Sequence, residues 1–209
     1  VHVSAAVKTL NMFDRQFENL SLDFSRQREA WRGAINGAAM TGTLLYSGAG
    51  PAAARLEMDL THLILPDKQH KGSDIPADPR RLPAVALRSK SFELRGKSLG
   101  ELNFLAEPDE SGWRFKRFNL TRAVMKLNAG GHWGYDGKQH ASEFDIEFSS
   151  PDMGKTMEAF GVPDQLAGGE VSVNSHLSWP GAPADPQLAA LSGKINVSAK
   201  KGRFLQVKA

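Results

Sequence analysis

The chain has 209 residues, of which 41% are hydrophobic and 23% are charged, so it can bury a sizeable core and does not read as disordered. It contains no Cys, which excludes disulfides, thiolate metal sites and a Cys nucleophile. The net charge of +3 comes from Lys and Arg scattered along the chain. A nucleic-acid groove needs a concentrated basic stripe, so nucleic acid is not an expected partner.

No stretch approaches the roughly 20 apolar residues that a membrane-spanning helix needs, and no signal peptide is present. The first residues, 1–3, and the last, 204–209, lie in strand-like sequence. We therefore expect the chain to be part of a longer protein, with any membrane anchor outside it.

Apolar and polar side chains alternate along residues 54–64, and the same period recurs at 144–148, 171–179 and 195–199. A period of two indicates half-buried strands. Turn-forming breaks separate the strands, which predicts a meandering, largely antiparallel sheet. These breaks fall at residues 48–51, 96–97, 109–112, 134–138 and 168–169.

The main interruption covers residues 66–83, where a polar run over 67–74 precedes Pro76 and Pro79. We interpret it as a loop or linker within one continuous fragment. It divides the sequence into a first sheet segment, 1–65, and a second one, 84–209.

The two segments carry a weak internal repeat. Residues 17–24 precede a polar turn and Trp31-Arg32, and residues 99–106 precede a polar turn and Trp113-Arg114. Such a repeat indicates strand units added side by side, which lengthens a sheet instead of closing it.

One stretch breaks the strand pattern. Residues 150–152 supply Ser as an N-cap, Pro at the first helical position and an acidic residue. Met153, Met157 and Phe160 then fall on one helical face. The pattern predicts a short amphipathic helix over about residues 151–160.

Gly161 follows as a C-terminal cap and Pro163 prevents the helix from resuming. A second, weaker helical turn is expected over residues 185–191. The expected fold is therefore mainly β, a long, largely antiparallel sheet with one or two short helices.

The sequence offers little chemistry. Its six His residues do not show metal-ligand spacing, and neither a nucleophile elbow nor a phosphate-binding loop is present. Carboxylates such as Asp145 and Glu147 alternate with apolar residues, as on the solvated face of a strand. We predict no catalytic, cofactor or metal site, and a non-enzymatic protein.

The four Trp residues stand at the ends of predicted strands, at Trp31, Trp113, Trp133 and Trp179. They either cap the ends of a core or border an apolar groove. The sequence leaves both alternatives open.

Residues 144–209 follow a specific order of motifs: a strand to Phe148, then Asp152-Met153-Gly154, Phe160-Gly161-Val162-Pro163, Trp179-Pro180-Gly181 and finally Lys201-Gly202-Arg203-Phe204-Leu205. This order resembles the C-terminal part of the YhdP family, within the AsmA-like superfamily that includes TamB. Upstream, Gly112-Trp113 and residues 129–133 fit the same family. The resemblance covers residues 80–209 well, and its motifs are structural.

The resemblance implies a β-sheet curled into a trough lined with apolar side chains. It also implies the periplasmic portion of a bridge anchored in the inner membrane of Gram-negative bacteria. Such proteins move phospholipid to the outer membrane and maintain its barrier. The implied partners are phospholipid, the inner membrane through a segment outside this chain, and the outer membrane or its proteins.

The alternating strands provide the candidate lining of this groove, and the helix either plugs it or packs on the sheet. The candidates are Leu56, Met58, Leu60, Leu102, Phe104, Met125, Leu127, Phe144, Ile146, Phe148, Met153, Met157 and Phe160. The same residues would suit the core of a closed sandwich. The alternative functions are an assembly scaffold for outer-membrane proteins that acts by strand addition and, more weakly, an enzyme acting on envelope glycans or lipids.

Overall fold

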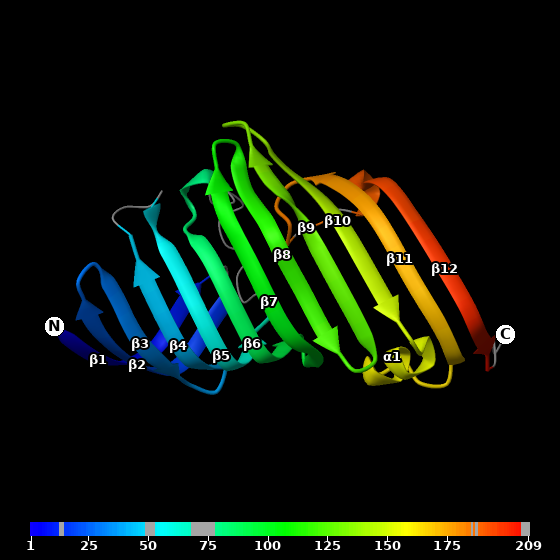
Figure 1. Ribbon diagram of the computed structural model, residues 1–209, viewed down its shortest axis with the longest axis horizontal. Helices are drawn as coiled ribbons and strands as arrows, with labels where there is room; N and C mark the ends of the chain where they lie inside the picture. The colour runs from blue at the N-terminus through cyan, green and yellow to red at the C-terminus, as the bar shows by residue number, and fades with distance from the viewer. Residues whose placement is uncertain (13–14, 49–52, 68–77, 185, 187, 206–209) are drawn as a thin grey trace.

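The computed structural model describes residues 1–12, 15–48, 53–67, 78–184, 186 and 188–205. These residues form one twelve-stranded sheet whose strands lie side by side in chain order (Figure 1). The strands are β1 His2–Met12, β2 Arg15–Gln27, β3 Ala30–Asn36, β4 Met40–Ser47, β5 Arg55–Leu65, β6 Ala84–Leu94, β7 Lys97–Asp109, β8 Gly112–Arg122, β9 Met125–Tyr135, β10 His140–Ser150, β11 Leu166–Pro180 and β12 Ser192–Phe204.

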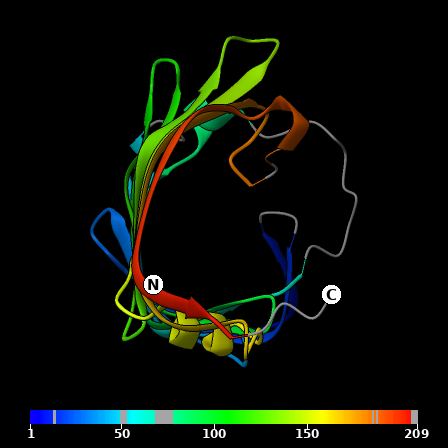
Figure 2. The same cartoon turned by 90° about the vertical axis from the view of Figure 1, so that its right-hand side faces the viewer.

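Viewed along its long axis, the sheet curls into a C (Figure 2). Neighbouring strands pair antiparallel throughout the described sheet, except for β5 and β6, which run in the same direction. The predicted fold class, a long, curved, largely antiparallel sheet that forms an apolar groove, is confirmed.

The parallel pair was not predicted, and it falls where the chain crosses from β5 to β6. Ala84, the first residue of β6, is the register partner of Arg55, the first residue of β5. After Leu65 the chain therefore returns to the end of the sheet where β5 began before it enters β6. A 3-10 turn, η2 Pro79–Arg81, precedes β6, and Asp78 accepts a hydrogen bond from the Arg80 N–H at its start. Residues 68–77 of the predicted polar loop lie outside the described residues.

The strand bounds repeat along the chain. β1 begins at residue 2 and β6 at 84, and β2 begins at 15 and β7 at 97, an offset of 82 in both cases. β4 and β9 begin at 40 and 125, and β5 and β10 at 55 and 140, an offset of 85. The sheet therefore contains two five-strand units side by side, with β11 and β12 added beyond them.

The predicted break at residues 168–169 is wrong, because both glycines lie inside β11. Gly168 has φ +66° and Gly169 has φ +96°, conformations that glycine adopts without strain. The strand therefore continues through this point, and its register with β12 is the same on both sides of the two glycines.

The predicted helix forms as α1 Met153–Ala159, with Asp152 rather than Ser150 as its N-cap. The Asp152 carboxylate accepts from the Lys155 N–H at 3.0 Å, so Pro151 precedes the helix instead of opening it. The predicted cap at its other end is confirmed. Gly161 has φ +79°, and its N–H donates to the Glu158 carbonyl at 2.9 Å, as in a Schellman motif.

A second 3-10 turn, η3 Leu188–Ala190, lies within the predicted second helical turn. Asp185 and Gln187 of that prediction lie outside the described residues. Among the helices of the described part of the chain, none has the length and apolar character needed to cross a membrane.

Candidate functional site

Register partners on neighbouring strands place their side chains on the same face of a sheet. Following the partners from strand to strand yields three apolar rows. The middle row is Phe24, Gly33, Leu44, Met58, Leu87, Phe104, Phe118, Ala129, Ile146, Ser175 and Ile195. The lower row, toward α1, is Leu22, Ile35, Gly42, Leu60, Ser89, Leu102, Leu120, Leu127, Phe148, Val173 and Val197. The upper row is Trp31, Tyr46, Leu56, Val85, Ala106, Phe115, Gly131, Phe144 and Leu177.

These rows form one face, the apolar face, which continues without a break from β2 to β12. Positions between the rows point the other way and form the polar face, with side chains such as Arg88, Asn103, Arg117, Glu143 and Asp145. The buried hydrophobic cluster is drawn from the apolar side. A single layer buries side chains only where its curvature makes them converge, so the apolar face is the concave one.

The structure brings the ten predicted strand residues to this one face. Leu56 and Phe144 lie in the upper row, Met58, Phe104 and Ile146 in the middle row, Leu60, Leu102, Leu127 and Phe148 in the lower row, and Met125 beyond it as the partner of Arg122.

The ten residues differ in how far they are accessible. Leu60 and Leu102 are 1% and 5% exposed, and Met125 and Phe144 are also buried. The other six, Met58 and Ile146 among them, are half-buried. The half-buried side chains are the ones that a ligand on this face could touch without displacing the core.

The helical candidates are held at the edge of the sheet. Phe160 packs against the core cluster, and Met153 and Met157 are half-buried. The buried side chain of α1 is Thr156, which sequence reasoning missed. Its hydroxyl donates to the Val124 carbonyl at 2.7 Å and lies 2.9 Å from the Ser150 hydroxyl. A Thr on the inward side of an otherwise apolar helix pattern was the available signal.

This contact fastens α1 at one end of the strands, beside the turn between β8 and β9 (Figure 1). We call this end the lower margin of the apolar face. The opposite end, which carries the turns after β7 and β9, is the upper margin.

All the Trp and Tyr residues of the chain lie along the upper margin, on the apolar side. Trp31 is the register partner of Tyr46, and Trp113 is the register partner of Trp133. Ser142 is the register partner of both Trp133 and Trp179 on the strands at either side of it. Tyr135 follows two residues after Trp133 on the same strand. We call this set the aromatic margin: Trp31, Tyr46, Trp113, Trp133, Tyr135 and Trp179.

Three indole N–H groups of the aromatic margin donate within the protein. Trp113 donates to the Pro83 carbonyl at 3.1 Å, and Trp179 donates to the Ala182 carbonyl at 3.2 Å. Trp133 donates to Nδ1 of His140 at 3.1 Å. These three rings therefore border the apolar face at its upper end and are fixed there by hydrogen bonds within the protein.

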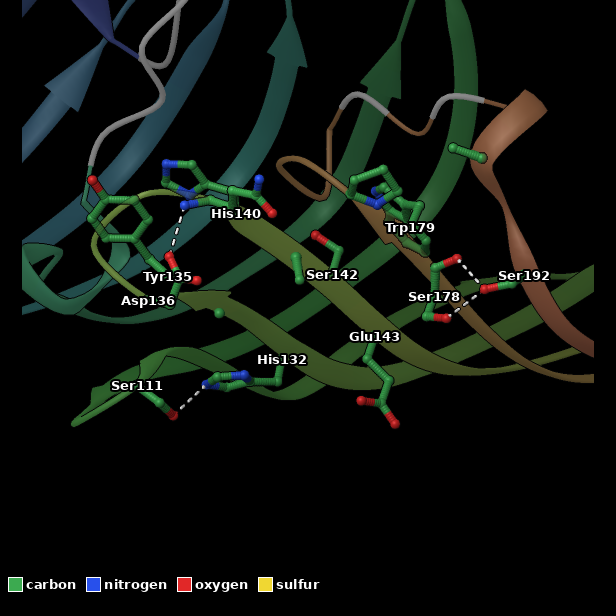
Figure 3. Close-up of a pocket in the computed structure, with 15 residues that line it drawn as sticks. Ser111, His132, Tyr135, Asp136, His140, Ser142, Glu143, Ser178, Trp179 and Ser192 are labelled. Carbon is green, nitrogen blue, oxygen red and sulfur yellow. Dashed lines mark hydrogen bonds between the residues drawn. The ribbon is translucent and has the colours of Figure 1, made fainter.

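A depression of about 570 Å³ lies at the end of β9, β10 and β11 (Figure 3). His140 and Trp179 lie on one side of the sheet, and His132 and Glu143 lie on the other. Its lining mixes polar side chains such as Ser142 with apolar ones such as Trp179, and it wraps the upper edge instead of covering the apolar rows. A second depression, of about 520 Å³, is lined mostly by polar-face residues of β3–β8.

Two histidines have opposite environments. Burial lowers the pKa of His140, whose ring stacks on Tyr135 with centroids 4.3 Å apart. The hydrogen bond to Asp145 raises the pKa of the exposed His176 on the polar face. At neutral pH, His140 is therefore neutral and can accept the Trp133 indole N–H.

Ser111, His132 and Asp109 form the group that comes nearest to a catalytic triad. The Ser111 hydroxyl and the Asp109 carboxylate both contact the same nitrogen, His132 Nε2, at 3.4 and 3.1 Å. A relay needs them on opposite nitrogens. Burial opposes ionisation of Asp109, but hydrogen bonds from His132 and Ser111 outweigh it and lower the pKa to about 2. These contacts hold the turn after β7 against β9.

Within the described ranges, no cluster of three or more His, Asp or Glu side chains could hold a metal ion. The family model described as YhdP protein matches residues 1–209, the whole chain. No curated protein and no solved structure shows a significant match.

Proposed function

Because the chain belongs to the YhdP family, an envelope protein family linked to lipid transport, we propose that its apolar face shelters the acyl chains of phospholipid on their way between membranes. The protein acts without catalysis: it offers a continuous apolar surface along which lipid moves. Phospholipid is its ligand.

The observation that carries this proposal is the unbroken apolar face. Exposing an acyl chain to water costs about 0.8 kcal/mol per CH₂, or about 12 kcal/mol for a chain of about 16 carbons. An apolar surface that crosses every strand from β2 to β12 removes most of this cost at each position along the sheet. A lipid can then move from strand to strand without crossing a polar barrier.

The accessible parts of the face are the half-buried middle row and the β12 end. Met58, Phe104 and Ile146 are half-buried, and Ile195 and Val197 of β12 are 57% and 64% exposed. The lipid contacts these side chains, while buried residues such as Leu60 and Leu102 keep the sheet packed.

The proposed setting is the periplasm of a Gram-negative bacterium. A segment outside this chain anchors the protein in the inner membrane, and the outer membrane or its proteins receive the lipid at the other end. The family membership supports this setting, and the role that follows from it is maintenance of the outer-membrane barrier.

Site-specific photo-crosslinking tests the proposal. A photo-reactive phenylalanine analogue replaces Met58 or Ile146 on the apolar face, with Arg88 and Asp145 on the polar face as matched positions. We expect phospholipid adducts, detected by mass spectrometry of the purified chain, at the first two positions only. Adducts confined to the polar face, or none in lipid-loaded protein, would contradict the proposal.

The same experiment separates the strand-addition alternative, which predicts crosslinks from the β12 edge to outer-membrane proteins. One observation counts against that alternative. β12 carries Lys194 and Lys200 on its polar face, and Lys201 has φ +58°. Charges and backbone irregularities of this kind discourage the pairing of an edge strand with another chain.

A further inference from the structure

Two basic side chains stand on the apolar side of the lower margin. Lys97 is the register partner of Leu94, which packs against the core cluster, and Arg122 is the partner of Met125. Each therefore shares a face with an apolar residue. Lys97 begins β7 and Arg122 ends β8, so both lie at strand ends, beyond the lower row of the apolar face.

Local contacts place the two side chains at the lower margin. Arg122 Nη1 donates to the Ser98 carbonyl at 2.9 Å, which draws Arg122 toward the start of β7. The Lys97 ammonium lies beside the end of α1, since a Cβ added to Gly161 would be 2.9 Å from Nζ. Arg95 and Gly96, with φ +51° and +68°, form the tight turn that sets where Lys97 begins β7.

The charges of Lys97 and Arg122 are not neutralised by the described part of the chain, where neither takes part in an ion pair. The upper margin differs. There Arg80 pairs with Asp78 at 2.7 Å and Arg114 with Asp109 at 3.1 Å. Three of its four indole donors are also satisfied internally.

Apolar side chains adjoin the two cations. Leu94, Leu99, Val124 and Phe160 are half-buried against the core cluster, and Val162 is 46% exposed. Positive charge next to partly exposed apolar surface matches a molecule with an anionic head and a hydrocarbon body.

We propose that Lys97 and Arg122 hold the phosphate of a phospholipid whose acyl chains lie on the apolar face. The inference rests on the proposed function and deepens it, because it assigns the headgroup to the lower margin. Arg presents a planar fork that suits phosphate oxygens, and Lys adds a mobile point charge. The lipid thus enters the groove in one orientation, with its phosphate toward α1.

Lipid retention by purified protein tests the assignment. The chain, the double variant Lys97→Gln/Arg122→Gln and the control variant Arg88→Gln/Arg117→Gln are each loaded with phosphatidylglycerol or with diacylglycerol of the same acyl chains. Native mass spectrometry then measures the fraction of protein that keeps lipid. The control removes the same charge from the polar face, where Arg88 and Arg117 are exposed.

We expect phosphatidylglycerol retention to fall about fivefold or more in Lys97→Gln/Arg122→Gln and to stay unchanged in the control. Diacylglycerol lacks the phosphate, so its retention should be equal in all three proteins. Equal loss of both lipids, or equal phosphatidylglycerol retention in the two variants, overturns the assignment. If the unaltered chain retains neither lipid, the groove proposal itself fails.

Arg122→Lys is a further check against misfolding. This variant keeps the positive charge but loses the planar guanidinium group, and it should retain more phosphatidylglycerol than Arg122→Gln. Circular dichroism melts of each variant report whether the sheet is intact. An Arg122→Lys protein that melts like the unaltered chain but binds no better than Arg122→Gln would also contradict a role in holding phosphate.

Discussion

At the scale of single residues, the described part of the chain leaves no buried side-chain nitrogen or oxygen without a hydrogen-bond partner. The polar contacts in the core are few, and Ser150 and Thr156, 1% and 2% exposed, form one of them where α1 meets the sheet. They fix a short helix that has too few residues to be stable by itself.

Replacing Thr156 by Val keeps the shape of the side chain but removes the donor to the Val124 carbonyl. We expect the free energy of unfolding to fall by about 1–2 kcal/mol, because a buried carbonyl and the Ser150 hydroxyl lose a partner. Urea titration followed by circular dichroism measures the loss. Thr121→Val, at an exposed position of β8, is the control and should change little.

The two histidines with opposite pKa shifts predict a pH dependence. His140 should titrate below 6.5 and His176 above 6.5, as ring proton chemical shifts in NMR will show. A lowered folded-state pKa means that the unfolded chain binds more protons, so the His140 contribution is present above pH 6.5 and is lost as the pH falls through its folded pKa.

The raised pKa of His176 has the opposite sign, and its contribution is lost as the pH rises. His176 is exposed, so solvent screens its interaction with Asp145 and the effect on stability is small. A His140 titration above 6.5 would contradict a neutral acceptor for Trp133.

At the scale of elements, the outer strands carry features that the inner ones lack. β12 is exposed along its whole length and pairs only with β11 within the described sheet. The lysines on its polar face ensure that only one face of β12 is apolar, which discourages pairing with another chain.

Lys194→Val/Lys200→Val should therefore promote edge-to-edge association. We expect the fraction of dimer and larger species to rise several-fold in size-exclusion chromatography with light scattering. Lys90→Val/Lys126→Val, at exposed positions of strands paired on both sides, is the matched control. Equal association of both variants would mean that added apolar surface, not the edge, is responsible.

At the scale of the whole molecule, each strand packs chiefly on its sequence neighbours, as in a repeat protein. Stability in such an array is a sum of local terms and neighbouring interfaces. The core cluster draws its buried members from β2–β9, and β12 contributes none.

Amide hydrogen exchange should consequently be graded along the sheet. We expect amides of β6 and β7 to exchange slowest and those of β1 and β12 fastest, because the outer strands have one paired edge and little buried surface. Peptide-resolved mass spectrometry can check the order. Uniform protection across the strands would show that the sheet opens as a single unit.

Much of the architecture was predictable because alternation is a local property. The period of two placed Leu56, Met58 and Leu60 on one face of β5. It likewise placed Phe144, Ile146 and Phe148 on one face of β10. The helix near residue 153 was predictable for the same reason, since caps and glycine stops act within a few residues. Errors occurred where local signals compete, as at Asp152 against Ser150 and at the two glycines inside β11.

By itself, the sequence determined that the chain forms strands with one apolar and one polar face, that a short helix follows β10, and which family it belongs to. Tertiary structure alone decided that β5 and β6 run parallel, that the Trp and Tyr residues gather on one margin, and that Lys97 and Arg122 share the other margin with α1. The physical reason is that alternation sets which way each side chain points, whereas register between strands sets what stands beside it. Register depends on residues far apart in the chain.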